Sequence, residues 1–538
     1  MDASASEIVA AIKHLRLPEQ SVLIPASPPK KHKPLEECSK EDFLLAASPS
    51  IFLHVLTDYG LDAQTLARLE ATCTFFRRPA QLSPDTELPL SEVAALDMCY
   101  KRAIFKPMTT EERQHLKQRC GGSWKLVLRF FLAGEACTRR GKAVPLAGPG
   151  HSIALAKNGD VYSFGANSFG ELGNGTTEDQ TQPCLIRSLA GVRIIQASVA
   201  FGITLLISDA GRVYAFGRGR VITGAAHHAL AESDHGNGVK NVSTPHLIES
   251  LKDIFVVQAV IGNFFTAFLS REGRVYTVSW GKDGKLAHNT DMEDLEPRPL
   301  LGALENVPVV QISAGYCYLL ALTCQPGGMS VYSVGCGLGG KLGHGVKADE
   351  AHPRLIEEFR TLNLQPKMIS AGAWHSAVVG ADGRVFTWGW GLYGCLGHGD
   401  EECQSSPKLV QALANVKAAY VAAGDYMTFV VSEGGDVYSC GWGETSSLGH
   451  TSADNPEGNE QRSHVLTPEL VASLKKLGER IVHISITNSV HGEAHTFALA
   501  ESGKLYAFGA GRRGQLGVKL GANVTERCYP ELINIDLS

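Results

Sequence analysis

Short stretches in which apolar residues alternate with small or polar ones recur along the last three quarters of the chain. Residues 367–389, KMISAGAWHSAVVGADGRVFTWG, contain two such stretches on either side of a glycine-containing turn. Alternation with a period of two is typical of half-buried β-strands, and a glycine permits the positive φ of a tight hairpin. The pattern therefore predicts short antiparallel strands joined by tight turns.

The pattern occurs seven times, with three markers in a constant order. In most copies a glycine in the first stretch precedes the turn glycine by eleven residues, as Gly372 precedes Gly383, although the fourth copy is longer. A strand ending in glycine follows, and then a P-x-L element. The strand-end glycines are Gly165, Gly217, Gly281, Gly335, Gly389, Gly441 and Gly509, and the P-x-L elements begin at Pro183, Pro245, Pro299, Pro353, Pro407, Pro468 and Pro530.

Each repeat predicts one four-stranded sheet, and a single sheet of this kind cannot bury both of its faces. Sheets of this size are buried when they stack radially around an axis, as the blades of a β-propeller do. The spacing of 52 to 68 residues between strand-end glycines lies near the ~50 residues of the longer propeller repeats. We therefore predict a mainly β fold, a propeller over residues 143–538.

The repeat resembles that of the regulator of chromosome condensation family. The segments AGPGHSIAL, AGAWHSAVV and GEAHTFAL match the inner strands of that family, and GANSFGELGNG, GLYGCLGHG and GAGRRGQLG match its glycine-rich loop. The resemblance covers about three quarters of the chain and implies seven blades. His151, His375 and His495 occupy the family's histidine position, but Ile203, Phe265, Tyr318 and Met427 replace it in the other repeats, which predicts a packing role for this position.

The first repeat differs from the others in one respect. Its inner strand, KAVPLAGPGH, has no P-x-L element before it, whereas the chain ends on an additional copy at Pro530–Ile533. An open ring would leave an unpaired strand edge. We therefore predict that residues 530–538 join the strands at 143–165, so that one blade is built from both ends of the propeller.

The N-terminal part is of a different kind. Residues 1–42 predict a linker with one short helix and a proline-rich basic patch, SPPKKHKP, and residues 43–142 predict a small α-helical domain. Within it, residues 48–78 resemble an F-box, although the leucine expected before the proline is missing. The resemblance implies binding of a Skp-type adaptor; the alternative is a helical domain that only packs on the propeller. The adaptor-binding residues would be Pro49, Ile51, Leu56, Leu66, Leu69 and Phe76.

Composition narrows the classes of partner. The net charge is −5, which argues against a broad basic surface held on nucleic acid. Thirteen cysteines without a CxxC pair are typical of reduced thiols. The N-terminus does not read as a secretory signal, and the sequence has no run of 18 apolar residues. We expect a cytoplasmic or nuclear protein that does not cross a membrane.

Candidate catalytic and cofactor sites do not withstand inspection. The G-x-G-x-x-G pattern at 335–340, 389–394 and 509–514 recurs once per repeat in turn-rich sequence, whereas a dinucleotide site needs a strand–loop–helix context. His227, His228 and His235, with Glu232 and Asp234, lie in a polar insertion that is better read as a loop. No spacing of nucleophile, base or paired carboxylates indicates catalysis. We expect no enzyme activity, metal or cofactor.

Partner binding is expected at the loops. A UV-B photoreceptor of the resembled family has clustered tryptophans before the histidine position, whereas this chain has only Trp374 there, so light sensing is not expected. Trp388 should lie in the core. The candidate partner-binding residues are Trp390, Tyr393, Trp442, Arg512 and Arg513.

Three functions remain open. The first is a non-enzymatic interaction protein whose propeller binds a protein partner. With the F-box-like segment, such a protein would be a substrate receptor of a cullin-type ubiquitin ligase. The second is a guanine-nucleotide exchange factor for a Ran-like small GTPase, as the founding member of the family is. The third is a chromatin binder. The F-box-like segment and the lack of a long basic tail favour the first.

Overall fold

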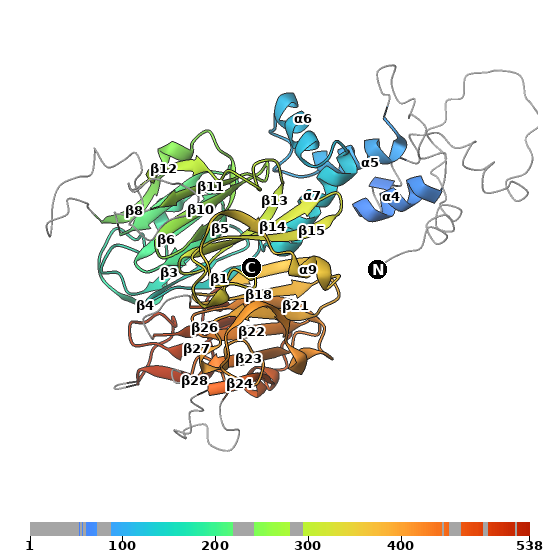
Figure 1. Cartoon of the computed structure of the whole chain (residues 1–538). Helices are drawn as coiled ribbons and strands as arrows, with labels where there is room; N and C mark the ends of the chain where they lie inside the picture. Colours follow the sequence, from blue (N-terminus) through green and yellow to red (C-terminus); the bar gives the residue numbers. More distant parts are fainter. Residues whose placement is uncertain are drawn as a thin grey trace, which may run out of the picture. The chain divides into compact units, whose positions relative to one another are not determined.

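The computed structural model describes residues 53, 56–57, 61–72, 88–218, 241–279, 294–443, 446–450, 464–487, 493–521 and 524–537. The chain forms two compact units, Met1–Ala133 and Gly134–Ser538 (Figure 1). The helices are α4 (Ala63–Thr72), α5 (Leu90–Tyr100), α6 (Thr110–Arg119) and α7 (Trp124–Cys137), and the unit boundary falls within α7. None of the helices in the described ranges is long and apolar enough to cross a membrane.

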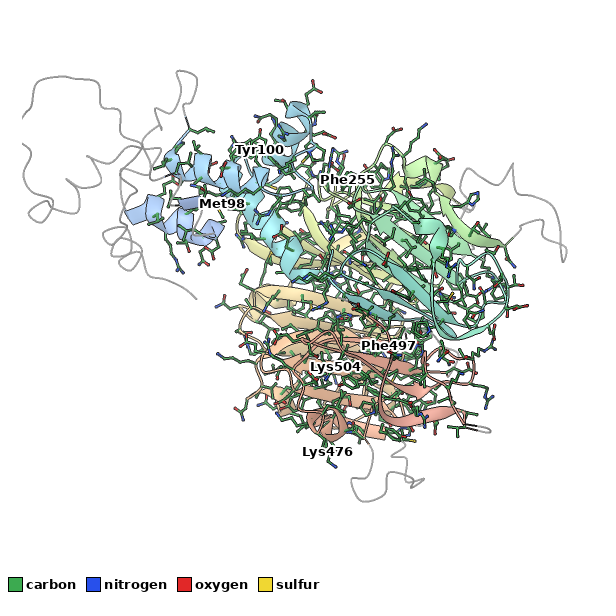
Figure 2. The ribbon with its side chains drawn as sticks, turned by 180° about the vertical axis from the view of Figure 1, so that it is seen from behind. Met98, Tyr100, Phe255, Lys476, Phe497 and Lys504 are labelled. Atoms are coloured by element: carbon green, nitrogen blue, oxygen red, sulfur yellow. The ribbon has the colours of Figure 1, made fainter. Side chains whose placement is uncertain are left out.

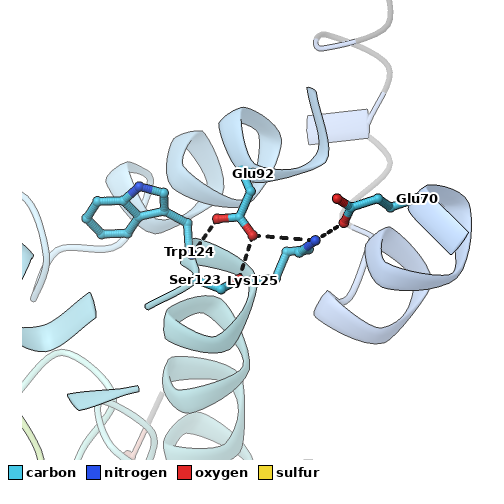
Figure 3. Close-up of polar contacts among 5 residues, drawn as sticks. All are labelled: Glu70, Glu92, Ser123, Trp124 and Lys125. Atoms are coloured by element: carbon cyan, nitrogen blue, oxygen red, sulfur yellow. Dashed lines mark hydrogen bonds and ion pairs between the residues drawn. The ribbon is translucent and has the colours of Figure 1, made fainter. Parts of the chain in front are cut away.

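The first unit is held together by a small core and a partly buried ion-pair network. Phe105 packs edge-on against Trp124, with ring centroids 6.0 Å apart. Glu92 is only 8% exposed, and its carboxylate accepts hydrogen bonds from Ser123 Oγ (2.5 Å) and from Trp124 N (2.6 Å) at the start of α7. Lys125 pairs with Glu92 and with Glu70 of α4 (Figure 3). The network therefore joins α4, α5 and α7.

The second unit consists of seven four-stranded sheets, each formed by four consecutive strands, which confirms the predicted seven-bladed propeller. The blades are, in order, β1 (Val144–Ala147), β2 (His151–Leu155), β3 (Val161–Gly165) and β4 (Gln180–Leu185); β5 (Ile194–Ala200), β6 (Ile203–Ser208), β7 (Val213–Gly217) and β8 (Val242–Leu247); β9 (Val256–Ile261), β10 (Phe265–Ser270), β11 (Val275–Ser279) and β12 (Asp294–Pro299); β13 (Val309–Ala314), β14 (Tyr318–Gln325), β15 (Gly328–Gly335) and β16 (Glu350–Leu355); β17 (Pro366–Ala371), β18 (His375–Gly380), β19 (Val385–Gly389) and β20 (Gln404–Leu409); β21 (Ala418–Ala423), β22 (Met427–Ser432), β23 (Val437–Trp442) and β24 (His464–Leu470); and β25 (Ile481–Ile486), β26 (His495–Ala500), β27 (Leu505–Ala510) and β28 (Glu526–Leu532).

Short helical turns lie between the strands in several blades. They are η2 (Arg187–Leu189), η4 (Glu249–Leu251), η5 (Leu338–Gly340), η6 (Leu392–Gly394), η7 (Gln411–Leu413), α9 (Glu358–Thr361) and α10 (Ala472–Lys475). Side chains fill the space between neighbouring sheets: Phe497 is fully buried, whereas Lys476 is exposed (Figure 2).

The first strand of each blade lies closest to the axis, where it packs against the first strand of the next blade; the sequence of contacts runs from β5 through β25 to β1 and closes the ring. Three glutamines at equivalent positions bridge neighbouring inner strands through their amide groups. Gln196 bonds both N and O of Ala259 (3.2 Å each), Gln258 those of Ile312 (2.9 Å each) and Gln311 those of Ile369 (3.0 Å each).

The histidine position forms a second set of links between blades. Each histidine bonds through Nε2 to the hydroxyl that follows the same position in the next blade, and that hydroxyl donates its own hydrogen to a backbone carbonyl. The histidine is therefore the donor. Burial lowers the pKa of His151 and His495 to about 3 and that of His375 to about 4, so all three are neutral, in agreement with the predicted packing role. The pairs are His151–Thr204 (2.9 Å), His375–Thr428 (2.7 Å) and His495–Ser152 (2.8 Å), with Glu171 O, Cys395 O and Gln515 O as the carbonyl acceptors.

The predicted sharing of a blade between the two ends of the propeller is wrong. The last P-x-L element lies in β28, which pairs with β27 of its own blade, as Tyr506 opposite Leu532 shows. Each P-x-L element is in fact the outermost strand of its blade, so the first blade is already complete at β4. The tail after β28 still reaches the first blade, because Lys157 N donates to Leu537 O at 3.1 Å.

Candidate protein-binding face

The two ends of the propeller carry different loops. Because consecutive strands run in opposite directions, the turn between the first and second strands lies at the same end as the loop after the third strand. We call this end the aromatic face. The turns between the second and third strands and the connections between blades lie at the other end, which we call the capped face.

Residues 134–142 cover the centre of the capped face. They run from the end of α7 to β1 and contact the beginnings of the inner strands of several blades. This segment therefore occupies the axial end at which those strands start. Cys137 Sγ bonds Lys367 O (3.0 Å), Gly141 N bonds Ile195 O (3.0 Å), and Arg139 Nη1 bonds Val482 O (3.4 Å).

The aromatic face carries rings that remain partly accessible to solvent. Most are half-buried, and Phe201 is 41% exposed. They come from the turns before the histidine position and from the loops after the third strand, and they span blades one to six. These residues are Phe169, Phe201, Phe264, Tyr316, Trp374, Trp390, Tyr393, Tyr426 and Trp442.

Four of the rings form a continuous strip across blades three to five. Phe264 meets Tyr316 edge-on with centroids 5.7 Å apart, and Tyr316 stacks on Trp374 at 5.0 Å. Trp374 in turn lies 4.9 Å from Trp390, which follows the strand-end glycine of the same blade. Beneath the strip, the fully buried ammonium group of Lys341 lies 5.4 Å from the Trp374 ring.

A second cluster joins blades five and six around Tyr393. Its ring lies 5.1 Å from Tyr426, 6.2 Å from Trp442 and 4.9 Å from His464. Tyr393 has a φ of +61°, in the left-handed region that costs a residue with a side chain roughly 1–3 kcal/mol. Such strain concentrates at functional sites, and here it places a large ring at the tip of a loop.

Over blades seven, one and two the face carries charged side chains beside the rings of Phe169 and Phe201. Arg512 and Arg513 are exposed, and the Arg513 Nε atom lies 3.5 Å from Glu493 Oε2. The guanidinium of Arg218 lies over the rings of Phe169 and Phe201, at 5.0 and 5.7 Å. We call the part over blades three to six, which carries only rings of this set, the aromatic half, and the part over blades seven, one and two, which carries rings and charged side chains, the charged half.

The structure places the sequence-predicted loop residues on this one face. Trp390, Tyr393 and Trp442 belong to the aromatic half, and Arg512 and Arg513 to the charged half, whereas Trp388 is fully buried as expected. Phe264, Tyr316 and Tyr426 were not predicted from the sequence, because only tryptophan was expected at the turns before the histidine position. Any aromatic residue at those turns was the signal.

The three F-box-like residues that the structure describes lie in a core. Leu56, Leu66 and Leu69 are between 0 and 4% exposed, so in this arrangement they support the helices rather than a surface. Pro49, Ile51 and Phe76 lie outside the described residues. The surface of α4 consists of other residues, namely Gln64, Ala67, Arg68 and Ala71.

The geometry of the described ranges offers no obvious centre for metal or nucleotide chemistry. Nowhere in them do three His, Cys, Asp or Glu residues form a group that could hold a metal ion, and the insertion with His227, His228 and His235 lies outside them. Two of the G-x-G-x-x-G segments contain only the single turns η5 and η6. A phosphate site of this type needs a helix N-terminus instead.

Comparison with known proteins identifies the repeat. Four segments, 158–207, 330–379, 382–431 and 434–499, match the model of the regulator of chromosome condensation (RCC1) repeat, and a second model of the same repeat matches 368–395. Each of the four runs from the third strand of one blade to the second strand of the next. The chain therefore carries RCC1 repeats in a seven-bladed propeller.

Several proteins are similar over most of the propeller. The ultraviolet-B receptor UVR8 of Arabidopsis thaliana is 29% identical over 384 residues, 71% of this chain and 68% of UVR8. Human Protein RCC2 is 27% identical over 369 residues, 61% of this chain and 67% of RCC2. The human E3 ubiquitin-protein ligase HERC2 is 28% identical over 372 residues, which are 68% of this chain but only 7% of HERC2.

Solved structures show the same architecture. Yeast RCC1 (Prp20) bound to Kap60 superposes with a TM-score of 0.56 at 22% identity, over 70% of this chain and 84% of that one. Prp20p from Saccharomyces cerevisiae, whose binding to Gsp1p and histones was studied, gives 0.55 at 21% identity, over 70% and 86%. At this level of identity the likeness shows a shared fold and nothing beyond it.

Proposed function

We propose that the protein is a non-enzymatic interaction protein that binds a protein partner on the aromatic face. The observation that carries the proposal is the set of nine partly accessible rings on that face. Aromatic residues and arginine are enriched in the centres of protein interfaces, where a few of them supply most of the binding energy. This face has both, because Arg512 and Arg513 flank the rings.

The opposite end of the propeller is less suited to a partner at its centre. Residues 134–142 already bond to the inner strands there, as Arg139 does to Val482. A partner on that face would have to displace these contacts or bind at the rim. The aromatic face requires no such displacement, which is why we assign the partner to it.

Removing two rings should abolish partner binding without unfolding the propeller. We expect Trp390→Ala combined with Tyr393→Gly to reduce recovery of bound proteins by at least about tenfold, since loss of one hot-spot ring costs about 2 kcal/mol or more. Glycine at 393 also relieves the positive φ, so the fold should persist. Quantitative mass spectrometry of proteins retained by the immobilised full chain measures this.

The matched control is Tyr529→Ala, which removes a ring that is 43% exposed on the outermost strand of blade seven. It should leave partner recovery unchanged. Equal recovery by the double variant would refute the assignment of this face. If the full chain instead accelerated GDP release from a Ran-like GTPase at substoichiometric amounts, nucleotide exchange would replace the proposed function of a non-enzymatic interaction protein.

We further propose that the first unit binds a Skp-type adaptor, which would make the protein a substrate receptor of a cullin-type ubiquitin ligase. The support is the F-box-like sequence at 48–78 together with a helical unit at that place. Because Leu66 and Leu69 are buried, replacing them would test folding rather than binding. The exposed side of α4 is the better surface to change.

An exposed substitution on α4 should therefore separate adaptor binding from folding. We expect Ala67→Arg in the full chain to weaken binding of a purified Skp-type adaptor by about tenfold or more, as measured by isothermal titration calorimetry. Gln114→Arg, at an exposed position of α6, should leave it unchanged. If the unchanged chain binds no adaptor, the F-box assignment is wrong.

A further inference from the structure

A small pocket lies on the aromatic face where blades seven, one and two meet. It has a volume of about 140 Å³ and is lined by Glu171, Glu493, Arg513 and the rings of Phe169 and Phe201, together with backbone and small side chains. A space of this size suits one side chain rather than a helix or strand. It is separate from the aromatic strip over blades three to five.

The charge of the lining is negative. Glu171 is only 4% exposed, and Glu493 adds a second carboxylate. Arg513 offsets one of the two: its Nε atom is 3.5 Å from Glu493 Oε2, while 51% of its own side chain is exposed. Burial raises the pKa of Glu171 and nearby Asp179 adds to the rise, whereas backbone hydrogen bonds and Arg513 oppose it.

The charge of Glu171 is not needed to shape its loop. Its Oε2 atom accepts a hydrogen bond from Phe169 N at 2.6 Å. At the equivalent place in blade seven, Gln515 Oε1 accepts the same bond from Arg513 N at 2.9 Å. A neutral amide therefore makes the same loop bond, so this bond does not require the negative charge at 171.

The aromatic walls favour a planar cation. The rings of Phe169 and Phe201 lie 6.1 Å apart at an angle of 59°. Arg218, which does not line the pocket, already places its guanidinium 5.0 Å from Phe169. A guanidinium stacks on aromatic faces and binds carboxylates through two parallel hydrogen bonds, which an ammonium group cannot do.

We propose that this pocket receives the guanidinium of an arginine side chain from the protein partner. The inference rests on the proposed function, because it names the chemistry by which the same face recognises its partner. The arginine would pair with Glu171 and Glu493 beside the two phenylalanine rings, and the half-exposed Arg513 would turn outward. The partner should therefore present an arginine that projects from its surface.

The test uses a peptide probe and its neutral counterpart with the full chain. Saturation-transfer NMR should show binding of Ac-Gly-Arg-Gly-NH2, with transfer to the arginine side-chain protons. Ac-Gly-Cit-Gly-NH2, in which citrulline replaces the charge but keeps the shape, should bind at least tenfold more weakly. Glu171→Gln should abolish the arginine signal because it removes the negative charge. Blade seven shows that glutamine is accommodated at this place, so the loop should keep its shape.

The control is Glu501→Gln, which removes an exposed carboxylate that pairs with Arg480 in the turn between β26 and β27, on the capped face. It should leave the signal unchanged. Equal signals from the two peptides, or an undiminished signal in Glu171→Gln, would overturn the inference. If the Trp390/Tyr393 variant loses partner recovery while Glu171→Gln keeps its arginine signal, the proposed function stands and this inference is refuted. If the Trp390/Tyr393 variant keeps partner recovery while Glu171→Gln loses the arginine signal, the proposed function is refuted and the pocket assignment stands.

Discussion

Replacement of Gly441 by alanine is expected to unfold the sixth blade. Gly441 lies near the end of β23, opposite Met427 of β22, with a φ of +113°. A Cβ atom there would lie 2.0 Å from Tyr426 O and 2.9 Å from Met427 Cα. Both are backbone atoms of the neighbouring turn and strand, so they cannot move without breaking the pairing of β22 and β23. We expect a loss of stability above about 4 kcal/mol.

The matched control is Gly503→Ala in the turn between β26 and β27. Gly503 also has a positive φ, +90°, but a Cβ atom there would meet no atom within 4 Å. Only the backbone strain remains, so we expect a loss of about 1–2 kcal/mol. Thermal unfolding followed by circular dichroism compares the two. Similar melting temperatures for both variants would show that the close approach at the strand end does not constrain the blade.

Deletion of residues 533–538 is expected to weaken the seam that closes the ring. Ile533 and Leu537 are 2% and 3% exposed and pack into a cluster that includes Ala154 of the first blade and Phe497 of the seventh. Burial of one such side chain contributes about 1.5–3 kcal/mol, so the deletion should cost about 3–6 kcal/mol. The backbone bond from Lys157 N to Leu537 O is lost as well.

Differential scanning calorimetry of the chain truncated after Leu532 measures this loss of stability. The truncated chain retains β28, so any change comes from the tail alone. Asn534→Ala changes an exposed side chain of the same tail and serves as the control, which should melt with the unchanged protein. A truncated chain with an unaltered melting temperature would mean that the remaining links, such as Ala147 N to Ser485 Oγ at 3.0 Å, suffice to close the ring.

The number and kind of blades could be predicted from the sequence, but not the positions along the chain at which each blade begins and ends. The period-two stretches and the repeated glycines predict strands and turns, because both depend on local chemistry. Assignment of a P-x-L element to one blade depends on whether it pairs with the strand before it or with the strand after it. The order of the markers along the chain is compatible with either pairing. Pro530 was therefore placed with the first blade, whereas β28 pairs with β27.

The links between blades were only partly visible in the sequence. The histidine position was recognised, but the hydrogen-bond partners of His151 and His375 lie 53 residues away in the next blade, and that of His495 lies 343 residues away. Gln196, Gln258 and Gln311 escaped notice, although each stands between apolar residues at the same place in its repeat. A polar residue repeated in a buried strand is the signal that indicates such a ladder.

The candidate site was predictable residue by residue but not as a surface. The partly accessible positions of Trp390 and Trp442 follow from their place after the strand-end glycine. The strip that joins Trp390 to Phe264 through Tyr316 and Trp374 crosses three blades, and its continuity depends on the packing of the blades around the axis. No local pattern encodes that arrangement.

Backbone hydrogen exchange, read by mass spectrometry on the full chain with and without a partner recovered by it, tests the assignment of the binding face most directly. We expect slower exchange in the turns at 316–317, 373–374 and 425–426 and in the loop at 390–403, with unchanged exchange in residues 134–142. Protection concentrated on residues 134–142, or on the outermost strands, with none on the aromatic turns would contradict this assignment.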